Sequence, residues 1–298
     1  MAFVALNTAN FEDGRFIQIP KNTIVDEPVW LDFNSVPDRT THPRNLIVIG
    51  EGSQIRIVER YTGAGMYFTN AVTEIVVGEN AIVEHIKLEE ESLESFHVAT
   101  IQVQQARNSI FKSHNISYGG RLVRNDTNAV LSTGCESTLN GLYLTNFKQH
   151  VDNHTALDHA EHHAMSHELY KGILDGASSA VFNGKIFVRK DAQKTDAKQT
   201  NKNLVLSENA IINTKPELQI RADDVRCTHG ATIGQLDREG LFYMRARGIN
   251  ENDARNLLIY AFARDVIDRI DLPGIQTYLE KALFKHLLDS RRVAEVAS

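Results

Sequence analysis

The sequence predicts an all-β protein with a helical C-terminus: a right-handed parallel β-helix, in which strands stack as a solenoid, capped by C-terminal α-helices. The first observation is a gap in proline usage, because none of the six prolines lies between Pro43 and Pro216. Proline cannot donate to a helix or to a strand ladder, so this long interval is hydrogen-bonded structure of one kind or the other. The short apolar runs inside it and a recurring small-residue pattern favour stacked strands.

The apolar runs have the length and composition of strands. Each is a few residues long, rich in β-branched or aromatic side chains, and bounded by Gly, Asn or Ser. Helical spacing does not extend over a helix-length stretch anywhere in the interval. The clearest runs are residues 45–49, 54–58, 74–77, 142–144, 185–188 and 203–206.

A short internal repeat predicts how the strands are joined. A small polar residue, followed by Ala, Ser, Thr or Gln, precedes a strand-like stretch many times, at unequal steps of roughly 20 to 40 residues. Equal steps would favour a propeller or leucine-rich repeats, whereas unequal steps favour a parallel β-helix, whose turns vary in length. A two-sheet sandwich is the alternative that remains open. The instances begin at Ser53, Asn80, Asn108, Ser137, Ser179, Asn209 and Gly230.

The last part of the chain has helical spacing. Apolar residues recur at i, i+3 and i+4 over residues 249–266, and the pattern restarts over residues 275–287 after a break at Pro273 and Gly274. Asn250 is a weak N-terminal cap signal for the first of these segments. We therefore expect two helices at the C-terminal end.

The change in pattern divides the chain into two domains. Residues 1–236 would form the parallel β-helix core domain, and residues 237–298 the C-terminal helical domain. The helices could cap the last rung, whose strand edge would otherwise be exposed, or they could dock a partner. The two roles are compatible.

Composition and charge exclude several classes of protein. The chain has 32 Lys and Arg against 38 Asp and Glu, a net charge of −6, whereas nucleic-acid binding favours a basic face. No run approaches the roughly 20 apolar residues of a membrane helix, and the first residues lack the pattern of a secretory signal. Two cysteines are too few for a disulfide framework, which predicts a reducing, cytoplasmic location.

No motif describes a self-contained active site. The phosphate-loop, dinucleotide-binding, G-x-S-x-G, C-x-x-C and H-E-x-x-H patterns are all absent from the sequence, so no nucleotide is expected. Asp223 and Asp224 are the visible carboxylate pair for an alternative function, a β-helix enzyme acting on carbohydrate. Adjacent residues of a strand face opposite sides, which argues against that alternative.

Six of the twelve histidines fall between His150 and His167 and could bind a transition metal through their imidazole nitrogens. On a strand they offer no pair at i, i+2, whereas on a helix His159 would share a face with His163. We prefer the interpretation that they are hydrogen-bonding residues on exposed rungs and a loop. For Cys135, the expectation is a packed small side chain.

Cys227 and His229 form the better constellation. Residues i and i+2 of a strand point to the same side, so the thiol and the imidazole would converge. This donor pair suits zinc or an iron–sulfur centre. Two ligands cannot complete a tetrahedral site, so others must come from elsewhere in the fold or from another chain. Taken alone, the pattern more often describes a buried free cysteine beside a hydrogen-bonded histidine.

Residues 215–237, which contain that pair, resemble the SufD family, scaffold proteins of the SUF iron–sulfur cluster assembly machinery. SufD shares a parallel β-helix with its paralogue SufB. The resemblance runs from about residue 10 to residue 290, and SufB-type chains look like Glu-His-Glu-Ala where this chain has Cys-Thr-His-Gly. Further matching stretches are residues 168–175, 182–188, 196–213 and 241–249.

This resemblance implies a non-catalytic scaffold subunit of a SufBCD complex. The chain would pair with SufB, and Cys227 and His229 would lie near the shared interface where a transient iron–sulfur cluster is built. The ATPase SufC would dock on the C-terminal helices, and no sequence feature indicates a flavin site. The expected docking residues are Arg247, Leu257, Leu258, Phe262, Leu279 and Leu283.

The resemblance also implies that the chain forms a homodimer without metal when it is alone. A self-contained metal-binding homodimer, with Cys227 and His229 meeting across a two-fold axis, is a separate alternative function. Two features depart from the family pattern. Family members usually begin with a longer helical region, whereas strand-like sequence starts here within about the first 20 residues. The family stretch that matches the histidine-rich segment often carries Pro and Cys, which residues 161–164 lack.

Overall fold

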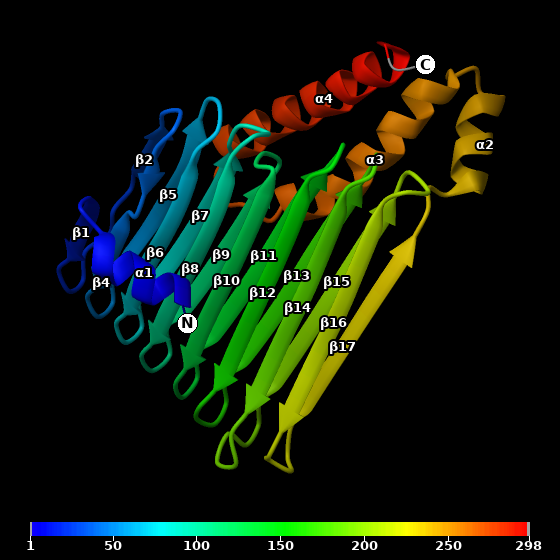
Figure 1. Ribbon diagram of the computed structural model, residues 1–298. Coiled ribbons are helices and arrows are strands. Elements are labelled where there is room, and N and C mark those ends of the chain that lie inside the picture. Colours follow the sequence, from blue (N-terminus) through cyan, green and yellow to red (C-terminus); the bar gives the residue numbers. More distant parts are fainter. Residues whose placement is uncertain (1, 297–298) are drawn as a thin grey trace.

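Seventeen strands stack into a parallel solenoid, accompanied by four helices, in the computed structural model (Figure 1). The structure describes the backbone of residues 2–296 and the side chains of residues 2–285. All strand pairings in this part of the chain are parallel, and successive strands alternate between two sheets. The chain therefore coils, which confirms the predicted parallel β-helix. The sandwich alternative is wrong, because its strands would be antiparallel.

The two sheets run along the solenoid and face each other across one apolar core. Sheet A contains, in spatial order, β1 (Gly14–Ile19), β4 (Arg44–Ile49), β6 (Phe68–Val77), β8 (Phe96–Gln105), β10 (Leu122–Leu131), β12 (His150–His159), β14 (Ser179–Val188) and β16 (Ile211–Ile220), with the short β3 (Thr40–Thr41) paired to β6. Sheet B contains, in spatial order, β2 (Val29–Ser35), β5 (Gln54–Gly63), β7 (Ile82–Glu90), β9 (Ile110–Ser117), β11 (Glu136–Thr145), β13 (Met165–Leu174), β15 (Asp196–Val205) and β17 (Arg226–Gly234).

Columns of inward-facing apolar residues hold the rungs in register. Buried and half-buried residues alternate strictly along β10, β12 and β14, as expected for strands with one face in the core. In-register stacking of these strands places one apolar residue of each rung above that of the next. One such column runs through Ile47, Ile75, Val103, Ala129, Leu157, Ile186 and Leu218.

Small residues fill the corners where the strands of sheet B begin. Asn80 and Asn108 adopt left-handed conformations, with φ of 56° each, which asparagine tolerates better than most residues. Ala81 and Ser109, which follow them, are fully buried. Cys135 occupies the equivalent corner, where its thiol donates to the carbonyl oxygen of Ala106 at 2.9 Å. The expectation that Cys135 is a packed small side chain is therefore confirmed.

The repeat is out of register at two of its expected positions. Ser137 lies inside β11 and Gly230 inside β17, whereas the predicted pattern would place both at corners. A small residue within a strand has the same sequence signature as one in a corner, and only the stacking distinguishes them.

The proline gap follows from the ladder. Pro216 lies on β16, which is the edge strand of sheet A and pairs only with β14. An edge strand tolerates a residue without a backbone N–H, whereas a strand with neighbours on both sides does not. The interval without proline therefore ends at the first edge strand that follows the stacked rungs.

The C-terminal segment forms three helices, one more than expected. The two predicted segments are α3 (Glu251–Ile267) and α4 (Pro273–Val296), and α2 (Arg238–Ala246) precedes them. The cap signal is confirmed, because the side chain of Asn250 accepts a hydrogen bond from the Asp253 backbone N–H at 2.9 Å. Pro273 is the first residue of α4, a position where its missing N–H has no helical acceptor to lose.

Two of these helices, α3 and α4, cover the flank of the solenoid, not its last rung, which corrects the expected placement (Figure 1). The outer face of sheet B is apolar at Ile86, Ile116 and Leu142, which pack with Ile259 and Val266 of α3 in one buried cluster. A sheet with an apolar outer face must be covered by another layer. The apolar residues on the outer face of sheet B therefore explain why the helices cover that face.

Ionic and hydrogen-bond contacts attach the same helices to sheet B. Lys171 of β13 contacts Asp265 at 2.7 Å, and Lys112 of β9 contacts Asp271 at 2.6 Å. The backbone N–H of Asp271 also donates to Glu84 at 2.8 Å. No helix within residues 2–296 combines the length and apolar character needed to cross a membrane.

A short N-terminal helix, α1 (Ala2–Asn10), was not expected from the sequence. Its Asn7 is fully buried and donates to the carbonyl oxygens of Pro43 and Asn70, at 3.0 and 2.9 Å. One side chain thus ties α1 to two successive rungs of sheet A. Its residues show no helical apolar periodicity, which explains why sequence analysis missed the helix.

Candidate functional site

The predicted pair Cys227 and His229 lies on β17, the last strand of sheet B. β17 pairs only with β15, where Ala197 stands opposite Cys227 and Gln199 opposite His229. Ala197 and Gln199 are each 1% exposed and face the solenoid interior. Side chains of neighbouring strands in register share a face, so Cys227 and His229 are turned toward the interior side of the last rung.

The rung that carries this pair is the open end of the solenoid (Figure 1). β16 and β17 are edge strands, and no element among residues 2–296 pairs with their free edges. Three large apolar side chains are exposed there: Ile211 at 59%, Ile220 at 42% and Ile233 at 54%. An unpaired edge with exposed apolar residues is suited to the addition of strands from another chain.

The Cys227 thiol and the His229 imidazole are metal-binding donors, but these two alone do not complete a metal site. Burial, together with the charge of Asp196, raises the pKa of the half-buried Cys227 thiol, so the proton stays on sulfur until a metal displaces it. Among the described residues, no three His, Cys, Asp or Glu side chains gather as a metal site would require. Cys227 and His229 therefore fit a soft metal or cluster only with ligands from a second chain.

The histidine-rich segment forms β12, the turn after it and the start of β13. His150 is half-buried beside Ser179, with Nδ1 2.7 Å from its hydroxyl oxygen, and His154 lies 2.8 Å from a carboxylate oxygen of Asp152. His159 is fully buried, with Nε2 2.9 Å from the hydroxyl of Ser166. The segment is strand and turn, as the preferred interpretation requires, and these three histidines contact polar neighbours, but His159 lies inside the solenoid and not on an exposed rung.

The carboxylate pair Asp223 and Asp224 lies in the bend before β17. The carboxylate of Asp224 forms an ion pair with Lys194, and the backbone N–H of Lys194 donates to the carbonyl oxygen of Asp224. The two aspartates are consecutive in a bend and do not face each other across a cleft. This geometry does not support the carbohydrate-active alternative.

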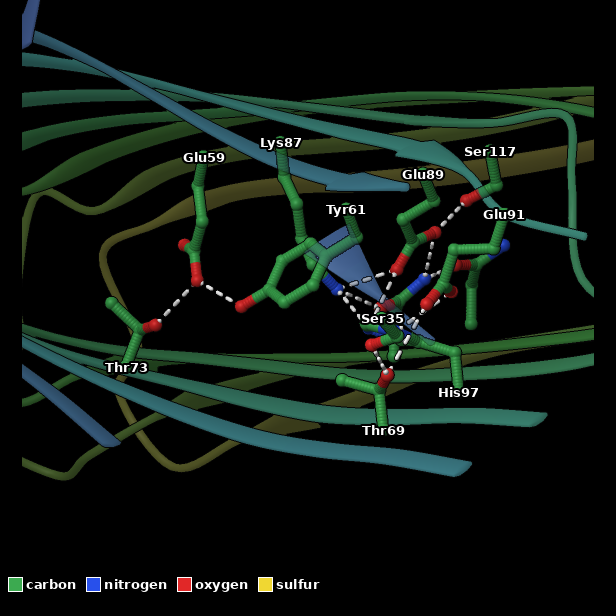
Figure 2. A network of polar contacts seen from close by, with 12 residues as sticks. Ser35, Glu59, Tyr61, Thr69, Thr73, Lys87, Glu89, Glu91, His97 and Ser117 are labelled. Atoms are coloured by element: carbon green, nitrogen blue, oxygen red, sulfur yellow. Dashed lines mark hydrogen bonds and ion pairs between the residues drawn. The ribbon is translucent and has the colours of Figure 1, made fainter. Parts of the chain in front are cut away.

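A buried charged network, which sequence analysis missed, lies wholly inside the solenoid (Figure 2). Its centre is Lys87 of β7, whose side chain is 1% exposed. The ammonium group forms an ion pair with Glu89 and lies 2.9 Å from Nε2 of His97. It also donates to Oδ1 of Asn125 at 2.7 Å and lies 5.2 Å from the centre of the Tyr61 ring.

Glu59 of β5 anchors the other end of this network. Its carboxylate accepts from Thr73 at 2.8 Å and contacts the hydroxyl of Tyr61 (Figure 2). It also lies 2.8 Å from Nε2 of His85. Burial opposes ionisation of Glu59, but the hydrogen bond from His85 and the charges of His85 and Lys87 outweigh it and lower its pKa to about 2. The interior of these rungs is therefore ionic around Glu59, and its carboxylate is hydrogen-bonded by His85, Thr73 and Tyr61.

The sequence carried a signal for this network. Glu59 is in phase with Ile55 and Ile57 on β5, and Lys87 is in phase with Val83 on β7, so both charged residues occupy inward positions. Charged residues at inward positions are paired when buried. Which charges pair depends on the rung spacing, which only the structure supplies.

The six residues expected to dock a partner divide between two environments. Leu279 and Leu283 are 2% and 4% exposed and pack in the cluster between the helices and sheet B. Phe262 is half-buried in the same cluster, and its ring lies 4.5 Å from the Lys171 ammonium nitrogen. These three side chains attach the helices to the solenoid, so they are not available for docking in this arrangement.

Arg247 and Leu257 are exposed, and Leu258 is half-buried where α3 meets α2. No residue of α2 is buried, and Phe242 and Tyr243 of this helix are 75% and 57% exposed. The guanidinium of Arg247 lies 3.5 Å from the centre of the Tyr243 ring. Phe242, Tyr243 and Arg247 at α2, and Leu257 of the adjoining α3, are thus exposed aromatic, basic and apolar residues, and we call this set the α2 surface.

Comparison with known proteins identifies the class to which this fold and site belong. Residues 33–262 match the family described as SUF system FeS cluster assembly, SufBD core domain. The solenoid is thus the core of an iron–sulfur cluster assembly protein. Within that class, the chain belongs to the SufD family.

Three relatives carry this assignment. The chain is 39% identical over 295 residues to the iron-sulfur cluster assembly SufBD family protein slr0076 of Synechocystis, covering 94% of this chain and 65% of that protein. It is 38% identical over 241 residues to SufD of Escherichia coli, covering 80% and 57%. It is 36% identical over 282 residues to the chloroplastic protein ABCI7 of Arabidopsis thaliana, covering 90% and 59%. The chain therefore spans 57 to 65% of the length of these relatives.

The first prediction concerns the buried charged network. Lys87→Met leaves the Glu89 carboxylate buried without its counter-ion, which should lower the free energy of unfolding by about 3–5 kcal/mol. Adding Glu89→Leu should recover most of that loss, because both charges are then absent. Urea denaturation of the two variants measures the difference. As a control, Lys21→Met breaks the exposed pair Lys21–Glu51 and should change the stability far less than Lys87→Met does, because solvent screens an exposed ion pair. Equal losses in the single and double variants would contradict the explanation.

The second prediction concerns His159. Burial lowers its pKa from 6.5 to about 4, against a weaker opposing effect from Asp158. Between pH 6.5 and pH 4, His159 binds a proton in the unfolded chain but not in the folded chain. The free energy of unfolding therefore falls as the pH drops over this range. Between pH 7.5 and pH 5, the wild type should lose about 2 kcal/mol more than His159→Gln, measured by urea denaturation. The exposed His162→Gln should behave as the wild type. A pH dependence unchanged by His159→Gln would refute this assignment.

Proposed function

We propose that this chain is a non-catalytic scaffold subunit for iron–sulfur cluster assembly, working with SufB and the ATPase SufC in the reducing cytoplasm. The observation that carries the proposal is the position of Cys227 and His229, which share the interior side of the open last rung. Two soft-metal donors at an unpaired strand edge need a second chain to complete both the ligand set and the sheet.

The proposed partner at this edge is SufB. The exposed side chains of Ile211, Ile220 and Ile233 flank the free edges of β16 and β17, and pairing would cover them. The interface then holds the nascent cluster transiently, through Cys227, His229 and donors from SufB. In this proposal, the chain itself binds neither a nucleotide nor a flavin.

The proposed docking site for SufC is the α2 surface. It combines two exposed aromatic residues with Arg247, and aromatic and arginine side chains dominate the binding energy of many interfaces. α3 connects this surface to sheet B through Lys171 and Asp265. A movement imposed on α2 by nucleotide-driven closure of SufC would therefore reach the solenoid through a direct ionic contact.

A self-contained metal-binding homodimer is the second candidate function. The same open edge favours it, because two copies joined there would bring two Cys227–His229 pairs toward one axis and supply four ligands. The two candidates differ in what the chain binds when it is purified alone. Stoichiometric metal in a homodimer without SufB would favour this second function.

The third prediction tests the scaffold site in the complex with SufB and SufC. Cys227→Ser removes the thiolate donor but keeps the side chain's size, so the three proteins should still co-purify while the cluster content falls to background. Iron and acid-labile sulfide, together with visible absorption after anaerobic reconstitution, measure the cluster. Cys135→Ser is the matched control, since Cys135 is a buried corner residue, and it should keep the cluster. A full cluster in Cys227→Ser would rule out the site, and failure of the wild type to co-purify with either partner would rule out the complex.

The fourth prediction separates the two proposed interfaces. Ile233→Asp on the open edge should weaken co-purification with SufB at least about tenfold and leave SufC binding unchanged, because a charge on that edge opposes pairing. Phe242→Asp on the α2 surface should have the reverse effect. Pull-down with each partner alone measures both affinities. Loss of both partners in either variant, or of neither, would contradict the assignment of surfaces.

A further inference from the structure

Behind His229, the next two strands of sheet B each carry a buried polar side chain on the interior face. Gln199 of β15 stands opposite His229, and Glu168 of β13 stands opposite Gln199. Gln199 is 1% exposed and Glu168 is 3% exposed, so both face the solenoid interior. Neighbouring strands lie about 4.8 Å apart, which places the three side chains in one file that ends at the open rung.

Two contacts orient the amide of Gln199. Its Nε2 donates to Oε2 of Glu168 at 2.6 Å. The same nitrogen lies over Gly184 of β14, where a Cβ would come within 2.3 Å of it, so only glycine leaves room for this position. With Nε2 directed at Glu168 on one neighbouring strand, the carbonyl Oε1 is the amide atom available to β17 on the other.

The carbonyl oxygen of Gln199 is a buried acceptor that lacks a partner. Oε1 makes no hydrogen bond within the described part of the chain although it is inaccessible to solvent. Such atoms are uncommon in folded proteins, because a buried acceptor without a hydrogen bond is unfavourable. His229 is the polar side chain opposite Gln199 on β17, and it is exposed, so its ring is free to turn toward the oxygen.

The geometry points to Gln199 as a positioning residue for His229: its carbonyl accepts a hydrogen bond from one ring nitrogen, and Glu168 keeps the amide in the required orientation. A neutral imidazole that donates from one nitrogen presents the lone pair of the other. Metal-binding histidines are generally oriented by such a hydrogen bond, which fixes the tautomer. The role in metal binding rests on the proposed function, whereas the hydrogen bond does not.

The decisive measurement is the tautomer of His229 in the whole chain without metal. In protein labelled with ¹⁵N-histidine at pH 8, a long-range ¹H–¹⁵N correlation of the rings should show one tautomer for His229, identified with His229→Gln. Gln199→Ala should convert it to a mixture, while the exposed His162 stays unchanged. A mixture in the wild type, or a tautomer unaffected by Gln199→Ala, would overturn the inference.

A reciprocal variant guards against misfolding. Glu168→Gln with Gln199→Glu keeps one amide–carboxylate hydrogen bond inside the file and keeps an acceptor opposite His229. This double variant should restore the single tautomer, whereas a purely structural role of Gln199 would leave the mixture in place. Failure of restoration in a folded double variant would therefore count against the inference.

Titration of the complex with SufB by Co²⁺ connects the hydrogen bond to metal binding, because Cys227 and His229 of this chain supply only two ligands. Cobalt bound through Cys227 gives a thiolate charge-transfer band, and Gln199→Ala should weaken that binding roughly 10- to 100-fold, with recovery in the reciprocal variant. If Cys227→Ser leaves the cobalt spectrum unchanged, the proposed metal site fails, and the tautomer alone still decides the role of Gln199. If Cys227→Ser abolishes the band while Gln199→Ala changes neither the band nor the tautomer, only the present inference fails.

Discussion

The parallel strand ladder is the constraint on which the rest of this structure depends. Each interior strand satisfies its backbone groups on two neighbours, and the ladder ends where β16 and β17 have a neighbour on one side only. Proline is absent from the stacked rungs and reappears at Pro216, on an edge strand. The same termination exposes the interior side of the last rung, where Cys227 and His229 lie. The same strand ladder therefore stabilises the stacked rungs and, where it ends, leaves the site accessible.

The two faces of sheet B explain the remaining architecture. Its inner face combines apolar columns with the ionic network of Glu59 and Lys87, whose charges are acceptable inside because each is paired. Its outer face is apolar in the middle of the sheet and requires cover, which α3 and α4 provide. Among the residues that the structure describes, none covers the last rung in this way. The helices thus stabilise the flank and leave the end of the solenoid open.

The side chains of the candidate site become less exposed from the edge strand toward the interior of the solenoid. Cys227 is half-buried and His229 exposed on the edge strand, whereas Gln199 and Glu168 behind them are buried. A site of this kind has its orienting groups in the rigid rungs and its donors at the surface where a partner binds. The chain belongs to the SufD family, and release of a transiently held cluster would be consistent with the function proposed above. A closed, four-ligand site within one chain would oppose release.

The sequence by itself favoured the parallel solenoid, predicted the segments that became α3 and α4, and put Cys227 and His229 on one face of a strand, because these follow from local periodicity and from proline's missing donor. The tertiary structure decided what depends on distant contacts. Leu279 and Leu283 have the spacing of any amphipathic helix, and only the apolar outer face of sheet B shows that they bind the solenoid. The pairing of Lys87 with Glu89 and the file from Glu168 to His229 depend on rung register, which no single strand encodes.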